Sequence, residues 1–565
     1  MRHIIALLLI PLALIGVPSA ASEPDTLGRD LLRETIATVE ASATASTGQF
    51  SPLWLTANRY GLGSVRPSSA YLRASLQRDI INDSSRTWRF GYGLDLAVAY
   101  NHERTGILQQ AYVEGAWKKI RLTIGAKQQP METQNHELAS GELTFGINAR
   151  PIPQVRLDID WFPFPWTRGW WQWRIFGSFG WMTDGRWQES YVSEGQRYAR
   201  HVRYHEKALY WLFGRKDIFP LTYEFGLRMA TQFGGNCYNI QSQRVNDGAK
   251  ANYHYNSGLK AYWQALTQQG SDNTDGSNPN VAGNTLGSYI MQLRYHGSTW
   301  QARAYWERFF EDHSMLTVQY GIRDMLIGGE VTVPRNPYLT TAVVEFMSST
   351  DQTGPIFHDP TPNFPEKVAG RDNYYNHNLY AGWLNYGLPI GNPFITSPLY
   401  NDAFGHSHVL HIYNNRIKAW HIALSGDPSP QWHWRAKASF TRNWGSYASP
   451  LPDILRQRYA MAELTFRPRP AAKGKPSSPH RPSTPTFKAQ PSSPNQPFSP
   501  TFKDQPSSPE HPSSLDYPST PTFKGKRHWA SYLQISLALG LDHGDLIGNS
   551  FGAQLTISKA LSLKP

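Results

Sequence analysis

Along much of its length, the sequence contains short runs in which apolar and polar residues alternate. The clearest run, residues 155–161, reads VRLDIDW, with apolar residues at odd positions and charged residues at even positions. Because successive side chains of a β-strand point to opposite faces, this run predicts a strand with one apolar and one ionic face. Similar alternation recurs at residues 72–77, 94–100, 119–127, 221–229, 300–307, 434–441, 533–539 and 554–558. The chain is therefore predicted to be all-β.

Weaker strand signals bring the prediction to roughly 16–18 strands. They lie around Val39, Tyr112, Phe145, Phe176, Tyr210, Met291, Val343, Ile422 and Leu464. Helical periodicity is nearly absent, and the best helix candidate is residues 258–267. Some gaps between strands are tight, such as His296–Ser298, whereas residues 234–285, 311–338 and 350–410 are expected to be long loops. Short turns on one side and long loops on the other are typical of outer-membrane barrels.

The N-terminus indicates export. Residues 1–21 read MRHIIALLLIPLALIGVPSAA, with a positive residue, an apolar run and a small-residue end, and they predict a secretory signal peptide. No later stretch approaches the roughly 20 apolar residues of a transmembrane helix. With Cys237 as its one cysteine, the chain forms no internal disulfide. Any part that spans a membrane is therefore expected to be made of strands.

The composition favours a membrane barrel over stacked soluble sandwiches. Aromatic residues make up 13% of the chain, yet the mean hydropathy is −0.50, as expected when only every second residue meets lipid. The expected polar faces carry charges of both signs, and aromatic residues gather near strand ends, as at 161–173. Closing the sheet also removes exposed strand edges. We therefore predict a transmembrane antiparallel β-barrel.

The barrel is predicted to comprise residues 22–466 and 528–565. Between these parts, residues 467–527 form a Pro/Ser-rich repeat insertion, with PSSP at Pro476, Pro491 and Pro506. Proline at this density blocks helices and strand ladders, so an extended, disordered loop is expected. Two interpretations stay open: a tolerated insertion without a role, and a cell-wall tether or glycosylated stalk.

Several stretches resemble the capsule-assembly Wzi family. The most specific are PLWLTANRYG, which begins at Pro52, and NARPIPQVR, which begins at Asn148. Further similar stretches are GYGLDLAVAY at Gly91, QQAY at Gln109, LTIG at Leu122, FPLTYEFG at Phe219 and QFGG at Gln232. The resemblance is clear over residues 35–235, looser to about 465, and resumes in the last two strands. The insertion and the non-aromatic C-terminus depart from the pattern.

The resemblance implies an outer-membrane barrel of eighteen strands. Its surface face would act as a lectin that attaches capsular polysaccharide to the cell, without covalent chemistry. The net charge of +12 suits an acidic partner, and export argues against nucleic acid. The expected partners are capsular or other acidic polysaccharide, outer-membrane lipid and lipopolysaccharide, and the barrel-assembly machinery.

Eight residues are candidates for carbohydrate binding. Arginine presents a planar fork to the carboxylates of acidic sugars, and tryptophan and tyrosine rings stack on sugar faces. The candidates are Trp54, Asn58, Arg59, Tyr60, Arg150, Gln154, Trp166 and Arg168. The alternative interpretation places them in girdles, turns and packing.

No catalytic residue, metal or cofactor is predicted. His201 with His205, and His406 with His408, have metal-like spacings, but neither pair has a matching third ligand. Asp158 and Asp160 could resemble a glycosidase pair, yet charge balance inside a lumen explains them better. Cys237 is expected to be an inert thiol in a loop.

Two functions remain as alternatives to a lectin. One is an outer-membrane channel, against which a lumen crowded with Arg, Glu and Trp side chains argues. The other is an outer-membrane enzyme on lipid or glycan, for which no nucleophile motif such as G-x-S-x-G appears.

Overall fold

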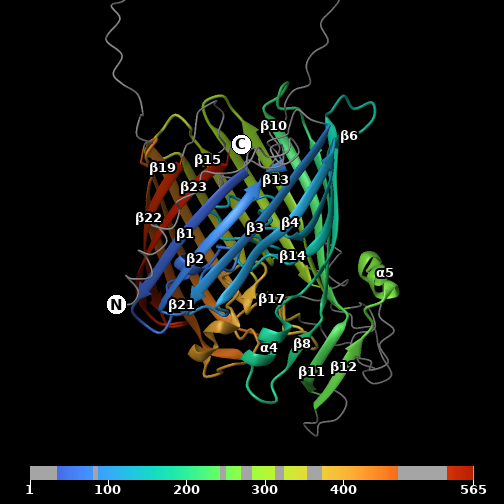
Figure 1. The fold of residues 1–565 in the computed structure, drawn as a ribbon, viewed down its shortest axis with the longest axis vertical. Helices are drawn as coiled ribbons and strands as arrows, with labels where there is room; N and C mark the ends of the chain where they lie inside the picture. Colours follow the sequence, from blue (N-terminus) through green and yellow to red (C-terminus); the bar gives the residue numbers. More distant parts are fainter. Residues whose placement is uncertain are drawn as a thin grey trace, which may run out of the picture.

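The chain forms a closed β-barrel (Figure 1). The computed structural model describes residues 35–80, 87–241, 250–268, 283–311, 323–352, 372–468 and 531–563. Its main sheet has 18 strands, each antiparallel to its neighbours, and the first strand pairs with the last from Thr35↔Leu563 to Ser46↔Gly552. The predicted antiparallel barrel of about 18 strands is confirmed.

The barrel strands follow one another around the wall in sequence order. They are β1 (Thr35–Ser46), β2 (Ser68–Arg78), β3 (Trp88–Tyr100), β4 (Gly106–Trp117), β5 (Ile120–Ala126), β6 (Gln154–Pro163), β7 (Trp171–Trp181), β9 (Arg203–Phe213), β10 (Leu221–Phe233), β13 (Asn284–His296), β14 (Gln301–Glu311), β15 (Met325–Thr332), β16 (Thr341–Ser348), β19 (Ile417–Ser429), β20 (Trp432–Gly445), β21 (Pro450–Phe466), β22 (Ser531–Gly544) and β23 (Ser550–Leu563).

The alternating runs form strands because each face meets a different medium. In β6, Arg156 and Asp158 are buried on the lumen side, whereas Val155 and Leu157 are exposed on the outer face. The same alternation holds in β3, where the buried Asp95 lies between exposed leucines. The outer face is thus an apolar belt for lipid, and the ionic face lines the interior.

Two strand predictions were wrong. Phe145 lies in no strand, because the segment around it leaves the wall and folds into the barrel with irregular backbone. Residues 325–332, predicted to be loop, form β15. Its alternation is weakened by Gly328, where the ring of Tyr305 fills the space that a side chain would occupy. The predicted loop at 234–285 was also wrong in part, because residues 235–241 and 250–255 form strands. Cys237 is buried in the first of these strands and not in a loop.

The two ends of the barrel differ. At the terminus end, where β1 begins and β23 ends, β4 and β5 are joined by two residues, as are β19 and β20. At the loop end the connections include residues 127–153, 234–283 and 349–416. In outer-membrane barrels the long loops face outward, so the loop end is the outer one.

The loop end carries the remaining elements. They are α3 (Leu53–Thr56), α4 (Gly185–Tyr191), β8 (Tyr198–Arg200), β11 (Gly235–Gln241), β12 (Lys250–Tyr255), α5 (Leu259–Thr267), β17 (Leu384–Asn385), β18 (Leu388–Pro389) and the 3₁₀-helix η3 (Pro398–Phe404). Strands β8, β11 and β12 form a separate small sheet beyond the wall (Figure 1). Helix α5 matches the one helix predicted. Within the described ranges, none of the helices has the length and apolar character needed to cross a bilayer.

The predicted signal peptide, residues 1–21, and the insertion at 467–527 lie outside the described residues, except for Arg467 and Pro468. Strand β21 ends at Phe466 and β22 begins at Ser531, both at the terminus end. In sequence, the insertion lies between these two strands.

Candidate functional site

Residues 127–153, which connect β5 to β6, fold into the lumen, and we call them the plug. Their backbone N–H groups donate hydrogen bonds to carboxylates of the barrel wall. The N–H of Ser140 donates to Glu345 on β16 at 2.7 Å, and that of Leu143 donates to Glu307 on β14 at 2.9 Å. Irregular backbone inside a barrel needs such partners, because a buried N–H without one is unfavourable.

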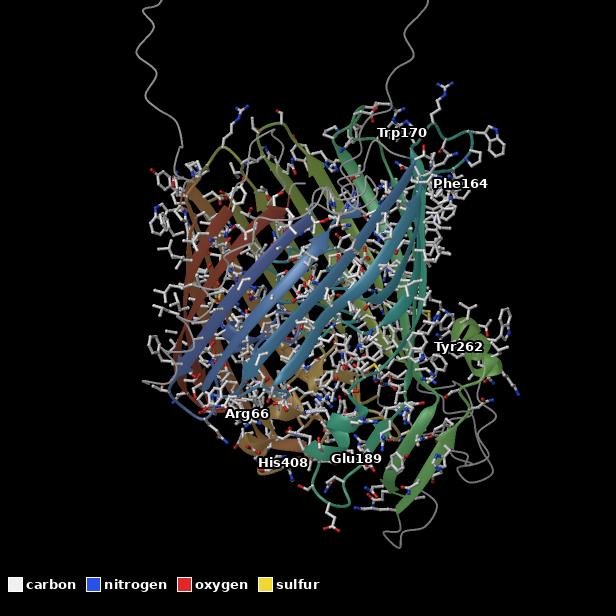
Figure 2. The ribbon with its side chains drawn as sticks, viewed as in Figure 1. Arg66, Phe164, Trp170, Glu189, Tyr262 and His408 are labelled. Carbon is white, nitrogen blue, oxygen red and sulfur yellow. The ribbon has the colours of Figure 1, made fainter. Side chains whose placement is uncertain are left out.

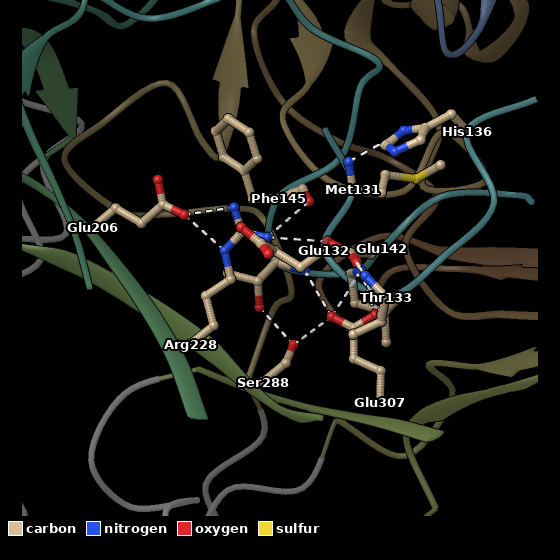
Figure 3. A network of polar contacts seen from close by, with 12 residues as sticks. Met131, Glu132, Thr133, His136, Glu142, Phe145, Glu206, Arg228, Ser288 and Glu307 are labelled. Carbon is tan, nitrogen blue, oxygen red and sulfur yellow. Dashed lines mark hydrogen bonds and ion pairs between the residues drawn. The ribbon is translucent and has the colours of Figure 1, made fainter. Parts of the chain in front are cut away.

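A buried ionic network fixes the plug to the wall (Figure 3). Arg228 of β10, 1% exposed, lies between Glu206 of β9 and Glu142 of the plug, and its Nη1 is 3.0 Å from the Glu142 carboxylate. Arg174 of β7 binds plug residue Glu132 at 2.6 Å. The charges predicted to balance one another in the lumen therefore also hold a loop.

A second loop segment, within residues 372–416, packs on the plug. Trp383 donates its indole N–H to the carbonyl of Thr144 at 2.8 Å, and Asn148 donates its amide to the carbonyl of Pro389 at 3.0 Å. Trp383 is fully buried. Two loops thus fill this part of the lumen with packed side chains and paired backbone.

Beyond the plug, four loops meet at a small cavity of about 10 Å³, which we call the loop-end pocket. It is lined by Gly61, Gly63, Ser64, Val65, His102, Glu103, Arg150, Tyr386, Leu388 and Leu399. This volume holds about one water molecule, so the pocket can receive a single ligand oxygen, such as a hydroxyl or one oxygen of a carboxylate.

Arg150 is the central cation of the loop-end pocket. Its guanidinium lies over the ring of Tyr386, at 4.3 Å from the centroid, and the residue is only 8% exposed. Its Nε is buried and has no hydrogen-bond partner among the described residues. Gly61, at φ +73°, makes this placement possible, because a Cβ there would lie 2.4 Å from Cγ of Arg150.

Cationic and aromatic groups surround the pocket. Arg104 lies on the Tyr386 ring at 5.8 Å, and Arg66 lies 4.0 Å from Glu103. Trp187 of α4 donates its indole N–H to Glu103 at 3.1 Å and stacks on Tyr191 at 4.8 Å. The three guanidinium groups outnumber the Glu103 carboxylate, which favours an anionic ligand.

Burial also affects the titratable groups of the pocket. It lowers the pKa of His102, so this ring is neutral at pH 7 and the positive charge comes from the arginines. Burial raises the pKa of Glu103, an effect that the nearby Arg66 opposes. The pocket therefore combines fixed cations with one partly buried carboxyl group.

The predicted site residues lie in three places. Arg150 is in the loop-end pocket. Asn58 and Tyr60 anchor the plug: Asn58 donates its amide to the carbonyl of Ser140 at 2.9 Å, and the N–H of Tyr60 donates to the carbonyl of Ile147 at 2.7 Å. Gln154 is buried at the start of β6.

Trp54 and Arg59 lie deeper in the barrel interior. The indole of Trp54 is buried and donates to Ser439 at 3.0 Å, while Lys437 lies 4.6 Å from its ring centroid. Arg59 pairs with Glu463 at 3.7 Å. Both residues pack the interior against the wall.

Trp166 and Arg168 lie at the terminus end, in the turn between β6 and β7. Trp166 is 96% exposed, and the carbonyl of Arg168 accepts a hydrogen bond from Arg215 of the next turn. Figure 2 shows Phe164 and Trp170, which bound this turn, at the end opposite to Arg66 and His408. The structure therefore does not bring these two residues together with Arg150.

Sequence reasoning missed Arg66, Glu103, Arg104, Trp187 and Tyr386. These residues come from four separate connections between barrel strands, and no sequence pattern links the four. The one available signal was that the long loops are rich in such side chains.

The proposed metal spacings lead to no metal site in the structure. His205 Nδ1 bonds to the carbonyl of Ser178, and His408 Nδ1 bonds to the carbonyl of Tyr191, both at 2.8 Å. In the part of the chain that the structure describes, no three His, Cys, Asp or Glu side chains are grouped to hold an ion.

Comparison with known proteins assigns the chain to a protein family. The family model described as capsule assembly protein Wzi matches residues 35–396, more than half of the chain. Among curated proteins, none matches by sequence.

The barrel is similar to several solved structures at low identity. One is Wzi, described as an outer membrane protein involved in group 1 capsule assembly in Escherichia coli and a carbohydrate-binding β-barrel, with 12% identity and a TM-score of 0.46; the alignment covers 94% of this chain and 85% of that one. Another is Pseudomonas aeruginosa OccK2 (OpdF) in complex with glucuronate, with 9% identity and a TM-score of 0.42 over 94% and 97% of the two chains.

The family match and the closed barrel with its apolar belt confirm the predicted outer-membrane location and capsule-related role. The chain belongs to the Wzi family of capsule assembly proteins.

Proposed function

We propose that this protein holds an acidic capsular or exopolysaccharide at the outer surface and that the loop-end pocket is a contact point. The observation that carries the proposal is Arg150, a buried arginine stacked on Tyr386 with an unpaired Nε. A buried polar group without a partner is unfavourable, so a ligand carboxylate or hydroxyl that reached it would gain a strong charge-assisted bond.

The arrangement supports binding rather than catalysis. The Arg150 and Arg104 guanidinium groups and the Tyr386 ring can contact a sugar by charge and by its apolar face. A polymer that repeats the same unit would engage many copies of the protein, so weak individual contacts suffice for retention. We therefore propose a lectin without enzymatic activity.

Further partners belong to the same proposal. The apolar belt would contact outer-membrane lipid and, at the loop end, lipopolysaccharide, and the barrel-assembly machinery would insert the chain. The channel alternative is less well supported, because the plug and the 372–416 segment fill the lumen.

Replacing Arg150 by Gln is expected to weaken binding of an acidic polysaccharide by about 10- to 100-fold, because a hydrogen bond to a charged group contributes about 1.5–3 kcal/mol. Binding would be measured with detergent-purified full-length protein and a fluorescently labelled uronic-acid polymer, with a neutral glucan alongside. Arg168→Gln, at the opposite end, is the matched control and should bind like the unaltered protein.

Equal affinity of the Arg150 and Arg168 variants would show that the pocket does not contact the polymer. Binding of the neutral glucan as tightly as the acidic polymer would contradict the proposed ligand class.

A further inference from the structure

Helix α5 (Leu259–Thr267) lies outside the barrel wall, near the loop end (Figure 1). Its inner side packs on strands β7 and β10: the ring of Tyr262 lies 5.1 Å from Phe179 and 5.2 Å from Phe233. Ala261 and Ala265 are buried in the same cluster. The helix is thus docked on the outer surface of a barrel whose outer surface elsewhere faces lipid (Figure 2, Tyr262).

The helix lies where the outer wall changes from apolar to polar. On β9, the outward residues Trp211 and Leu209 are followed by Lys207 and His205 toward the loop end. Lys207 donates from Nζ to the carbonyl of Leu266, in the last turn of α5. A cation at the C-terminal end of a helix is stabilising, so α5 both binds and covers this polar band.

The helix also covers β10. Gln268, which ends α5, donates its amide to the hydroxyl of Thr231 at 3.1 Å. Thr231 follows the lipid-facing Tyr223 by eight residues on the same strand, so both point outward. Tyr223 belongs to a row of stacked rings at the terminus end, with Phe213 at 6.3 Å and Trp171 at 5.8 Å from Phe213.

The distance between the level of Tyr223 and the level of Thr231 matches the thickness of the apolar part of the membrane. Eight residues at about 3.3 Å each, tilted by about 40°, rise about 20 Å along the membrane normal, close to the ~25 Å apolar band of outer-membrane barrels. The ring row marks one interface, as aromatic girdles do. Helix α5 therefore lies at the other interface, on the loop-end side.

Part of the exposed side of α5 is an apolar stripe, next to the polar Lys260 and Thr267. Leu259 is 89% exposed, Trp263 59% and Leu266 39%. Their spacing of four and then three residues places them in one stripe along the helix. Such a stripe is unfavourable in water but favourable among acyl chains, with tryptophan suited to the interface.

We propose that α5 is a membrane-interface helix that inserts Leu259, Trp263 and Leu266 among the lipid acyl chains of the loop-end leaflet. The helix lies where the apolar belt of the barrel ends, at the level of the second membrane interface, and this position favours lipid over a protein partner. Interfacial helices of this kind bury their apolar face at the boundary between headgroups and chains.

The test uses a fluorophore on a single cysteine, in full-length protein that carries Cys237→Ala. The label is attached at Trp263→Cys on the stripe or at Gln264→Cys on the adjoining polar side. Each protein is reconstituted in phosphatidylcholine vesicles that contain a fraction of lipids brominated in the acyl chains. Leu537→Cys, on the exposed outer face of β22, gives the signal of a fully lipid-facing site.

The label at 263 is expected to be quenched by brominated lipid severalfold more than the label at 264, and to be protected from aqueous iodide. Leu259→Cys gives a second stripe position if the Trp263 variant does not fold. Equal iodide quenching at 263 and 264 would overturn the proposal. Protection at 263 without lipid quenching, lost when the protein is diluted in the vesicles, would instead assign the stripe to contacts between copies of the chain and would also overturn it.

Discussion

Replacing Arg228 by Met is expected to lower the free energy of unfolding of the barrel by about 3–5 kcal/mol. The substitution keeps an unbranched chain of similar volume but removes the cation between Glu206 and Glu142. Glu142 would then be buried without its arginine, and Glu206 would keep only the longer contact to Arg156 at 3.6 Å. A buried charge that loses its partner is far more unfavourable than a lost surface pair. The expected change would be measured by urea unfolding of the protein in lipid vesicles, followed by tryptophan fluorescence.

Arg200→Met is the matched control. Arg200 pairs with Glu189 at 3.3 Å at the solvent-exposed loop end, so its loss should change stability by less than about 1 kcal/mol. If the Arg228 variant unfolded at the same urea concentration as this control, the ionic network would not hold the plug, and the description of the lumen would need revision.

Deleting residues 137–147 and joining the ends by a short Gly linker is expected to open the barrel to ions. These residues make the hydrogen bonds to Glu307 and Glu345 and carry the carbonyl that Trp383 binds, so their loss removes the plug and loosens the second segment packed on it. In planar bilayers the unaltered protein is expected to remain closed, whereas the deletion variant should show discrete conductance steps.

A deletion of residues 470–526 serves as the control, because the strands on either side of it, β21 and β22, end and begin at the terminus end, and the plug connects β5 and β6 at the loop end. It should leave the barrel closed. Retention of the barrel in both variants can be checked by the shift between unheated and heated samples on SDS gels. Conductance of the unaltered protein equal to that of the plug deletion would favour the channel alternative.

The candidate site shows which features could not be predicted from the sequence. Arg150 was identified as a sugar-binding residue, and the structure places it in a cationic, aromatic pocket. Trp166 and Arg168 have the same residue types, but they lie in a turn at the other end of the barrel. The residue types are the same in the two places, and only the direction in which each strand runs puts them at opposite ends of the barrel.

The strand predictions succeeded and failed for one physical reason. An alternating run such as 155–161 is a local signal, because the polarity of each residue indicates whether its side chain faces lipid or the lumen. Phe145 is apolar for another reason: it is buried inside the barrel, where the carboxylates of distant strands replace the pairing that a ladder would give. Apolar residues in a plug and in a strand have the same appearance in sequence.

The sequence by itself determined that this chain is exported in character, made of strands, apolar on one face and ionic on the other, and related to the Wzi family. The sequence carries this information because successive residues of a strand face opposite sides, so their polarity alternates with the two environments. The tertiary structure alone decided that residues 127–153 fill the lumen, that Arg150 meets Tyr386, and that α5 lies against the outer wall. These contacts join segments far apart in sequence, and their partners are set by the closure of the sheet, which no local pattern encodes.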